Sequence, residues 1–76
     1  MVFPLFSQVQ LMQDIPHLSL KKGSVGTIVE HYPTTGTEDG YSVEGLIAQD
    51  TVEVSESQIV IASVREKIQK VGSLIL

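Results

Sequence analysis

Few residues of this chain could take part in acid–base chemistry, and they are widely spaced. Asp14 and His17 lie three residues apart across Pro16, and a carboxylate at that spacing could orient an imidazole for general acid–base catalysis. Asp and Pro are also common initiators of turns, and nothing in the sequence marks a nucleophile that the pair would activate. We therefore expect these residues to shape a turn, and we predict no catalytic residue and no enzymatic activity.

Metal and phosphate sites can be assessed from spacing in the same way. His17 and His31 could bind a metal together with acidic residues, but no His-x-His or Glu-x-x-His spacing brings such ligands together. The segment Gly23-Ser24-Val25-Gly26 has the glycine content of a phosphate-binding loop. A phosphate loop leads into the start of a helix, whereas this one leads into a β-rich run. We predict no metal site and no cofactor.

Charge is unevenly distributed along the chain. Residues 1–64 contain two basic and eight acidic residues, a net charge of −6, whereas residues 65–76 contain three basic and one acidic residue, a net charge of +2. Affinity for nucleic acid depends on Lys and Arg side chains that neutralise phosphates. The acidic body formed by residues 1–64 therefore disfavours binding of nucleic acid and suits a basic protein partner. Lys21 and Lys22 form the one basic spot on that body. They are weak candidates for partner binding, because such a pair more often simply solvates a loop.

Length and composition limit the fold and the location. The chain has 76 residues, of which 42% are hydrophobic and 18% charged, as in ordinary soluble proteins, and this length suits a single small domain. The absence of cysteine excludes disulfides and thiolate sites. Apolar runs are too short to cross a bilayer, and the first residues lack the cationic start of a signal peptide. We expect a cytoplasmic protein.

Alternation of apolar and polar residues predicts five short strands. They are expected around Val9 and Leu11 and over residues 25–32, 41–47, 51–54 and 59–62. Gly26 suggests a bulge or a close backbone approach, and Gly45 suggests a bend. Residues 55–58 are expected to form one turn of 3₁₀ helix.

Two longer connections link these strands. Residues 13–23 are expected to form an ordered loop that ends at a glycine, and residues 33–40, which lack large apolar side chains, a mobile hairpin tip. Glu38 and Asp39 could form a weak cation site there, but a mobile, solvated hairpin tip is the stronger explanation.

Five short strands fit an all-β fold, and we predict a small five-stranded SH3-like antiparallel barrel. Four stretches carry a family resemblance: Asp14-Ile15-Pro16, Leu20-Lys21-Lys22-Gly23-Ser24-Val25-Gly26-Thr27-Ile28-Val29-Glu30, Tyr41-Ser42-Val43-Glu44 and Ser57-Gln58-Ile59. In order and spacing they resemble the small bacterial family called domain of unknown function 4926 (DUF4926), over roughly residues 5–62. Similar stretches occur in other SH3-like barrels, including the KOW domains of translation and transcription factors.

The resemblance implies an SH3-like barrel domain over residues 1–62. The family has no assigned activity and no established functional residues, so the resemblance implies no site. Gly45 stands where the family pattern has a bulky aromatic residue, and we expect Phe3 or Phe6 to fill the space.

Residues 63–76 extend beyond the family pattern and are predicted to form a short C-terminal helix. Ser63 and Glu66 have the spacing of a capping box, and apolar residues recur at helical intervals. These apolar side chains need cover. The segment could fold back on its own barrel, pack on a second copy in a homodimer, or bind a different protein. Its partner-binding candidates are Val64, Ile68, Val71 and Leu74.

Together these features predict a non-enzymatic protein-interaction module, an accessory or regulatory subunit of an unidentified bacterial protein complex. The alternative is a KOW-like RNA-binding barrel, in which Lys21 and Lys22 would lie beside Tyr32 or Tyr41 as a stacking surface.

Overall fold

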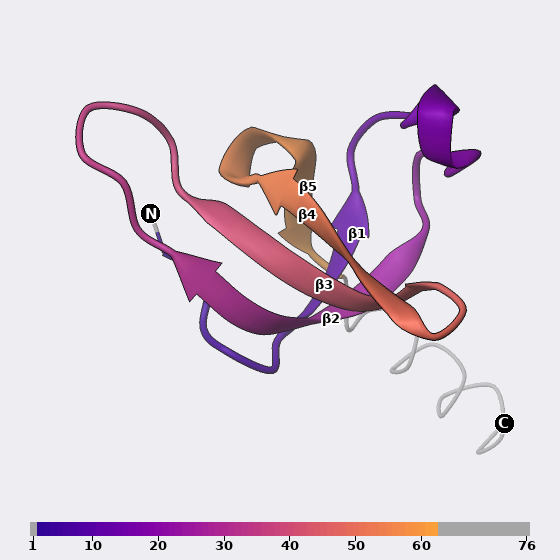
Figure 1. The fold of residues 1–76 in the computed structure, drawn as a ribbon, viewed down its shortest axis with the longest axis horizontal. Coiled ribbons are helices and arrows are strands. Elements are labelled where there is room, and N and C mark those ends of the chain that lie inside the picture. The colour runs from indigo at the N-terminus through magenta and orange to yellow at the C-terminus, as the bar shows by residue number, and fades with distance from the viewer. Residues whose placement is uncertain (1, 63–76) are drawn as a thin grey trace, which may run out of the picture.

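The computed structural model describes residues 2–62, which form one curled five-stranded sheet (Figure 1). The strands are β1 (Gln8–Leu11), β2 (Val25–Tyr32), β3 (Gly40–Ile47), β4 (Asp50–Ser55) and β5 (Ile59–Ile61). They lie in the order β4-β3-β2-β1-β5, and every neighbouring pair is antiparallel. The prediction of an all-β fold with five antiparallel strands is confirmed.

Two single turns of 3₁₀ helix interrupt the strands. The first, η1 (Pro16–Leu18), begins with a proline inside the long loop before β2 and was not predicted. The second, η2 (Glu56–Gln58), joins the edge strands β4 and β5 at the predicted position. Within residues 2–62 neither helix has the length to cross a membrane. The predicted C-terminal helix lies outside the described residues.

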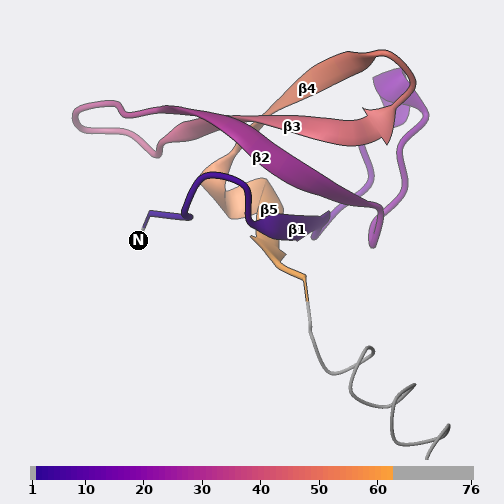
Figure 2. The same ribbon diagram turned by 90° about the horizontal axis from the view of Figure 1, so that it is seen from below.

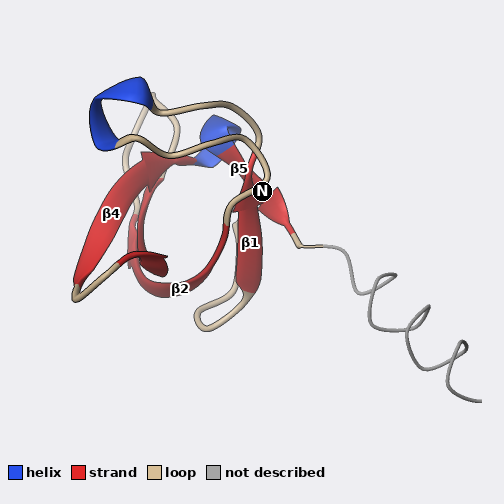
Figure 3. Cartoon of the chain, turned by 90° about the vertical axis from the view of Figure 1, so that its right-hand side faces the viewer, coloured by secondary structure: helices blue, strands red, loops and turns tan. Residues whose placement is uncertain are grey.

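The core lies on the inner, concave face of the curled sheet. Figure 3 shows the strands curling around this inner side. Strands β1 and β4 bury alternate residues, so the period-two pattern read from the sequence is the pattern of burial. The buried apolar residues are Phe3, Val9, Leu11, Ile15, Leu20, Ile28, Tyr41, Val43, Val52, Val54 and Ile59.

Gly26 and Gly45 let two strands approach closely and bend. A methyl group at Gly26 would lie 2.5 Å from Val43 Cγ1 and 2.7 Å from the Glu44 carbonyl oxygen, so β2 and β3 can meet there only at glycine. Gly45 has a φ of +97°, and the β3–β4 register shifts between Glu44 and Ile47. The predicted close approach and bend are therefore both confirmed.

The N-terminal segment runs beside β2 before it enters β1 (Figure 2). Phe3 is only 7% exposed, and its ring lies edge-on to that of Tyr41 with centroids 5.5 Å apart. The Phe3 N–H also donates a 3.1 Å hydrogen bond to Tyr41 Oη. Phe6, in contrast, is 71% exposed. Neither phenylalanine fills the space expected at Gly45. Phe3 is buried against Tyr41, earlier in β3, Phe6 is exposed, and a Cβ at Gly45 would meet only Gly26 Cα within 4 Å, at 3.9 Å.

Candidate functional site

A β-bulge in β2 decides which side chains reach the two faces of the sheet. Ile28 pairs with Val43, but Glu30 pairs with Ser42, so Val29 is an extra residue in β2. The bulge reverses the alternation beyond it. His31 therefore shares the inner face with Ile28, and Tyr32 points to the outer face.

His31 joins Asp39 and Tyr41 in a cluster at the base of the β2–β3 hairpin. The rings of His31 and Tyr41 are stacked with centroids 4.9 Å apart and an interplanar angle of 15°. His31 Nε2 lies 2.7 Å from Asp39 Oδ2, and the Thr34 N–H donates a 3.1 Å hydrogen bond to Asp39 Oδ1. The hydrogen bond to His31, followed by that from Thr34, lowers the pKa of Asp39.

The carboxylates of the hairpin are engaged by neighbouring protein groups. Besides the contacts of Asp39, the Glu38 carboxylate accepts hydrogen bonds of 2.7 Å from the Ser57 N–H and 3.1 Å from the Ser57 hydroxyl. These bonds fasten the hairpin to η2. These contacts give both acids a structural role in the hairpin.

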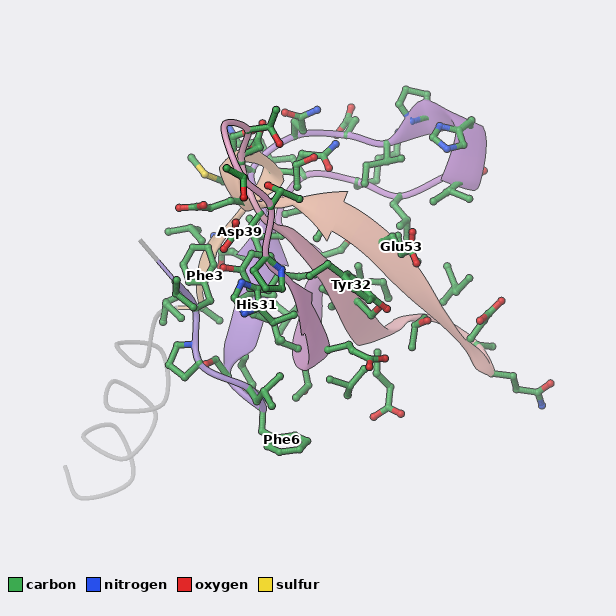
Figure 4. The ribbon with its side chains drawn as sticks, turned by 60° about the vertical axis from the view of Figure 1, so that its left-hand side comes forward. Phe3, Phe6, His31, Tyr32, Asp39 and Glu53 are labelled. Carbon is green, nitrogen blue, oxygen red and sulfur yellow. The ribbon has the colours of Figure 1, made fainter. Side chains whose placement is uncertain are left out.

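A groove of about 410 Å³ lies between this hairpin and β4. Its lining includes Tyr32, Asp39 and Glu53. In Figure 4, His31 points toward Asp39 while Tyr32 points away from them. Its lining combines Tyr32 and Glu53 of the outer face with the core residues Tyr41 and Val54, so the groove borders both faces of the sheet.

The outer face of β2, β3 and β4 carries three carboxylates. Glu30, Ser42 and Glu53 are cross-strand neighbours in one row, and Glu44 lies two residues further along β3. Tyr32 Oη lies 2.7 Å from Ser42 Oγ, so the tyrosine ring is fastened over the sheet. We call Glu30, Tyr32, Glu44 and Glu53 the acidic face. It has no Lys or Arg, because these residue types occur in residues 2–62 only at positions 21 and 22.

The predicted lysine pair lies in the loop between η1 and β2, with both residues exposed. Tyr32 is at the opposite end of β2, and Tyr41 is 0% exposed. The lysines are therefore not brought beside either tyrosine that was expected to stack on RNA. The other predicted partner-binding residues, Val64, Ile68, Val71 and Leu74, lie outside the described residues.

Asp14 serves the loop before β2. Its Oδ1 accepts a 2.8 Å hydrogen bond from the Lys22 N–H. In the described part of the chain no hydrogen bond joins Asp14 to His17, and no group of three His, Asp or Glu residues is placed to hold a metal ion. The glycine-containing segment that follows leads into β2, as expected for a turn.

The His31 cluster and the acidic face were both missed from the sequence. Each depends on the register between β2 and β3, which the bulge at Val29 sets. In the sequence, the His31 cluster was signalled only by a histidine before the hairpin turn and an aspartate after it. The acidic face was signalled only by glutamates in three neighbouring strands.

Comparison with known proteins identifies a family. The family described as Domain of unknown function (DUF4926) matches residues 5–46, which include Glu30, Tyr32 and Glu44 but not Glu53. No curated protein and no solved structure matches the chain. The family match covers more than half of the 76 residues, so the resemblance read from the sequence is confirmed. The chain therefore belongs to the DUF4926 family of domains of unknown function.

Proposed function

We propose that this protein is a non-enzymatic protein-interaction module that binds a basic partner through its acidic face. In this proposal it is an accessory or regulatory subunit of a bacterial protein complex in the cytoplasm. The observation that carries the proposal is the set of three carboxylates, Glu30, Glu44 and Glu53, on one sheet face where residues 2–62 place no cationic side chain.

We further infer that the curled sheet closes into an SH3-like barrel. The strand order β4-β3-β2-β1-β5 and the short η2 link between the two edge strands support this closure. The bend at Gly45 and the close approach at Gly26 supply the necessary curvature. A closed sheet would hold the acidic face as a rigid, outward surface.

The spacing of the carboxylates suits a basic partner. Glu30 and Glu53 are separated by two inter-strand steps, about 10 Å, and Glu44 lies about 7 Å along β3 from the row that they share. These separations are close to the screening length of physiological salt, about 8 Å. The carboxylates therefore repel one another weakly, while their fields add at a cationic surface that approaches the sheet.

Tyr32 adds an apolar contact to this charged surface. Its hydroxyl group is held by Ser42, so the ring loses little freedom on binding. A tyrosine ring packs against lysine and arginine side chains through its face, and tyrosine is among the residues enriched at interfaces. The acidic face thus combines charge with a fixed aromatic group.

The hydrogen bonds made by other acidic residues support a non-enzymatic role. Asp39 is bound by His31 and Thr34, and Glu38 is bound by Ser57. The remaining candidate, Asp14, accepts its hydrogen bond from a loop amide. These carboxylates act as structural ties in the described residues.

The test is affinity capture from native lysate with the full chain, in wild-type form and in two matched variants. Glu53→Gln removes one charge from the acidic face, and Asp50→Asn removes one charge from the same strand at the β3–β4 turn. We expect the same basic protein to be recovered repeatedly, with less recovery on Glu53→Gln and at high salt, and unchanged recovery on Asp50→Asn.

Three results would contradict the proposal. One is a strictly monomeric chain that recovers no protein. Another is equal loss of the partner in both variants. The third is salt-dependent binding of single-stranded RNA that disappears on Lys21→Glu and Lys22→Glu, which would assign the function to the basic loop instead.

A further inference from the structure

The groove between the β2–β3 hairpin and β4 has a fixed tyrosine ring along one side. Tyr32 pairs with Gly40, and Gly40 pairs with Ser55, so these three residues form one row across β2, β3 and β4. A methyl group at Gly40 would lie 3.8 Å from Tyr32 Cδ2, which places the Tyr32 ring beside the glycine. The Tyr32 hydroxyl group lies 2.7 Å from Ser42 Oγ, two residues further along β3. The ring therefore lies over β3, next to the side chains of β4.

Glu53 of β4 supplies a carboxylate to the same groove. It pairs with Ser42, so it lies one inter-strand step, about 5 Å, from the residue that holds the Tyr32 hydroxyl group. Within residues 2–62 no hydrogen bond or ion pair engages the Glu53 carboxylate. The two other acids that line the groove, Glu38 and Asp39, are bound by protein groups. Glu53 is thus the acid that can pair with a group entering the groove.

Core residues form another part of the lining. Tyr41 and Val54 both line the groove, and they are 0% and 4% exposed. With a volume of about 410 Å³ the groove falls within the range of small-ligand sites, about 300 to 1,000 Å³. A ligand that fits this lining needs an apolar stem for the core residues, a flat face for the tyrosine ring and a cationic head for the carboxylate.

Arginine has all three properties, whereas lysine lacks the flat face. The guanidinium group is planar, stacks on aromatic rings and donates two parallel hydrogen bonds to a carboxylate. The lysine ammonium group is a compact, strongly hydrated charge. Both side chains have an apolar stem. The ring and the carboxylate together therefore distinguish two basic residues that the charge of the acidic face attracts alike.

We propose that the groove binds one arginine side chain of the basic partner, with the guanidinium group stacked on Tyr32 and paired with Glu53. Gly40 has no side chain to fill the space between the ring and β4, so the guanidinium group has access to both. The inference rests on the proposed function, and it adds the residue type that the partner must present.

The test compares two peptides of equal length and charge in NMR titrations of the full chain. One peptide has arginine at its basic positions and the other has lysine. We expect the arginine peptide to bind about five to ten times more tightly. Tyr32→Leu should remove this preference by weakening the arginine peptide alone, and the amide spectrum shows whether the variant is folded. Glu53→Gln, at an exposed position, is the second variant and should also reduce the preference.

Glu44→Gln is the matched control, because Glu44 belongs to the acidic face but does not line the groove. It should weaken both peptides equally and preserve the preference for arginine. Two outcomes would overturn the inference and leave the proposed function intact: equal affinity for the two peptides, with shifted signals on the acidic face, or a preference for arginine that persists in both Tyr32→Leu and Glu53→Gln. If neither peptide binds at low salt, the proposed function fails as well.

Discussion

Gly26→Ala tests the close contact between β2 and β3. The added methyl group would lie 2.5 Å from Val43 Cγ1, 2.7 Å from the Glu44 carbonyl oxygen and 3.2 Å from Leu46 Cγ. The Glu44 oxygen is part of a strand paired on both sides, with Thr27 and Thr51, so it cannot retreat without disturbing two ladders. The sheet must open locally to accept the substitution.

The expected loss is a large share of the total stability. Overpacking of this kind costs about 3 kcal/mol, and the reduced freedom of the unfolded chain returns about 0.7 kcal/mol. The net loss is about 2 kcal/mol, against a total of roughly 4 to 11 kcal/mol for a domain of this size. The midpoint of thermal unfolding should fall by about 10 °C.

Urea and thermal unfolding, followed by circular dichroism, measure this loss. Gly40→Ala is the matched control, because Gly40 also lies in a strand, and the nearest atoms to its added methyl group are 3.8 Å away. We expect Gly40→Ala to change the unfolding free energy by no more than about 1 kcal/mol. Equal stability of the Gly26→Ala variant and the wild type would refute the close contact and the strand arrangement built on it.

Four further substitutions test the core and the hairpin cluster. Phe3→Ala should cost up to about 3 kcal/mol of unfolding free energy, whereas Phe6→Ala should change it by less than about 0.5 kcal/mol; similar effects in urea unfolding would contradict the burial of Phe3. Tyr41→Phe should destabilise by about 1 to 3 kcal/mol, because the Phe3 N–H loses its acceptor, and hydrogen exchange at that amide should accelerate. Hydrogen bonds to His31 and from Thr34 lower the pKa of Asp39 from 3.8. The ionised Asp39 carboxylate therefore stabilises the fold fully above about pH 4, and this stabilisation is lost as the pH falls through the lowered pKa of the folded state. Wild type should therefore exceed Asp39→Asn in stability at neutral pH and approach it in acid; a difference in urea unfolding that is independent of pH would exclude this role.

Strand positions could be predicted wherever one face of a strand is buried. Val9 and Leu11 alternate with glutamines, and Val52 and Val54 alternate with polar residues, because their inner face contributes to the core and their outer face does not. Gly26 was informative for a related reason, since a glycine within an apolar strand marks a place where another backbone comes close.

Which face of the sheet each residue of β2 occupies could not be predicted, because a bulge leaves no clear signal in the local sequence. Val29 lies in an apolar run that reads as a regular strand, yet it is the extra residue that sends His31 inward and Tyr32 outward. Contacts between segments far apart in sequence were also out of reach. The burial of Phe3 depends on Tyr41, 38 residues away, and the row of Glu30 with Glu53 exists only once β3 lies between β2 and β4.

The most direct test of the central claim is an NMR titration of the full chain with a short peptide rich in lysine and arginine. A peptide of equal length with serine at those positions is the control. We predict that only the basic peptide shifts amide signals and that the shifted signals map to Glu30, Tyr32, Ser42 and Glu53. Shifts centred on Lys21 and Lys22, or no shifts at low salt, would contradict an acidic face that binds a basic partner.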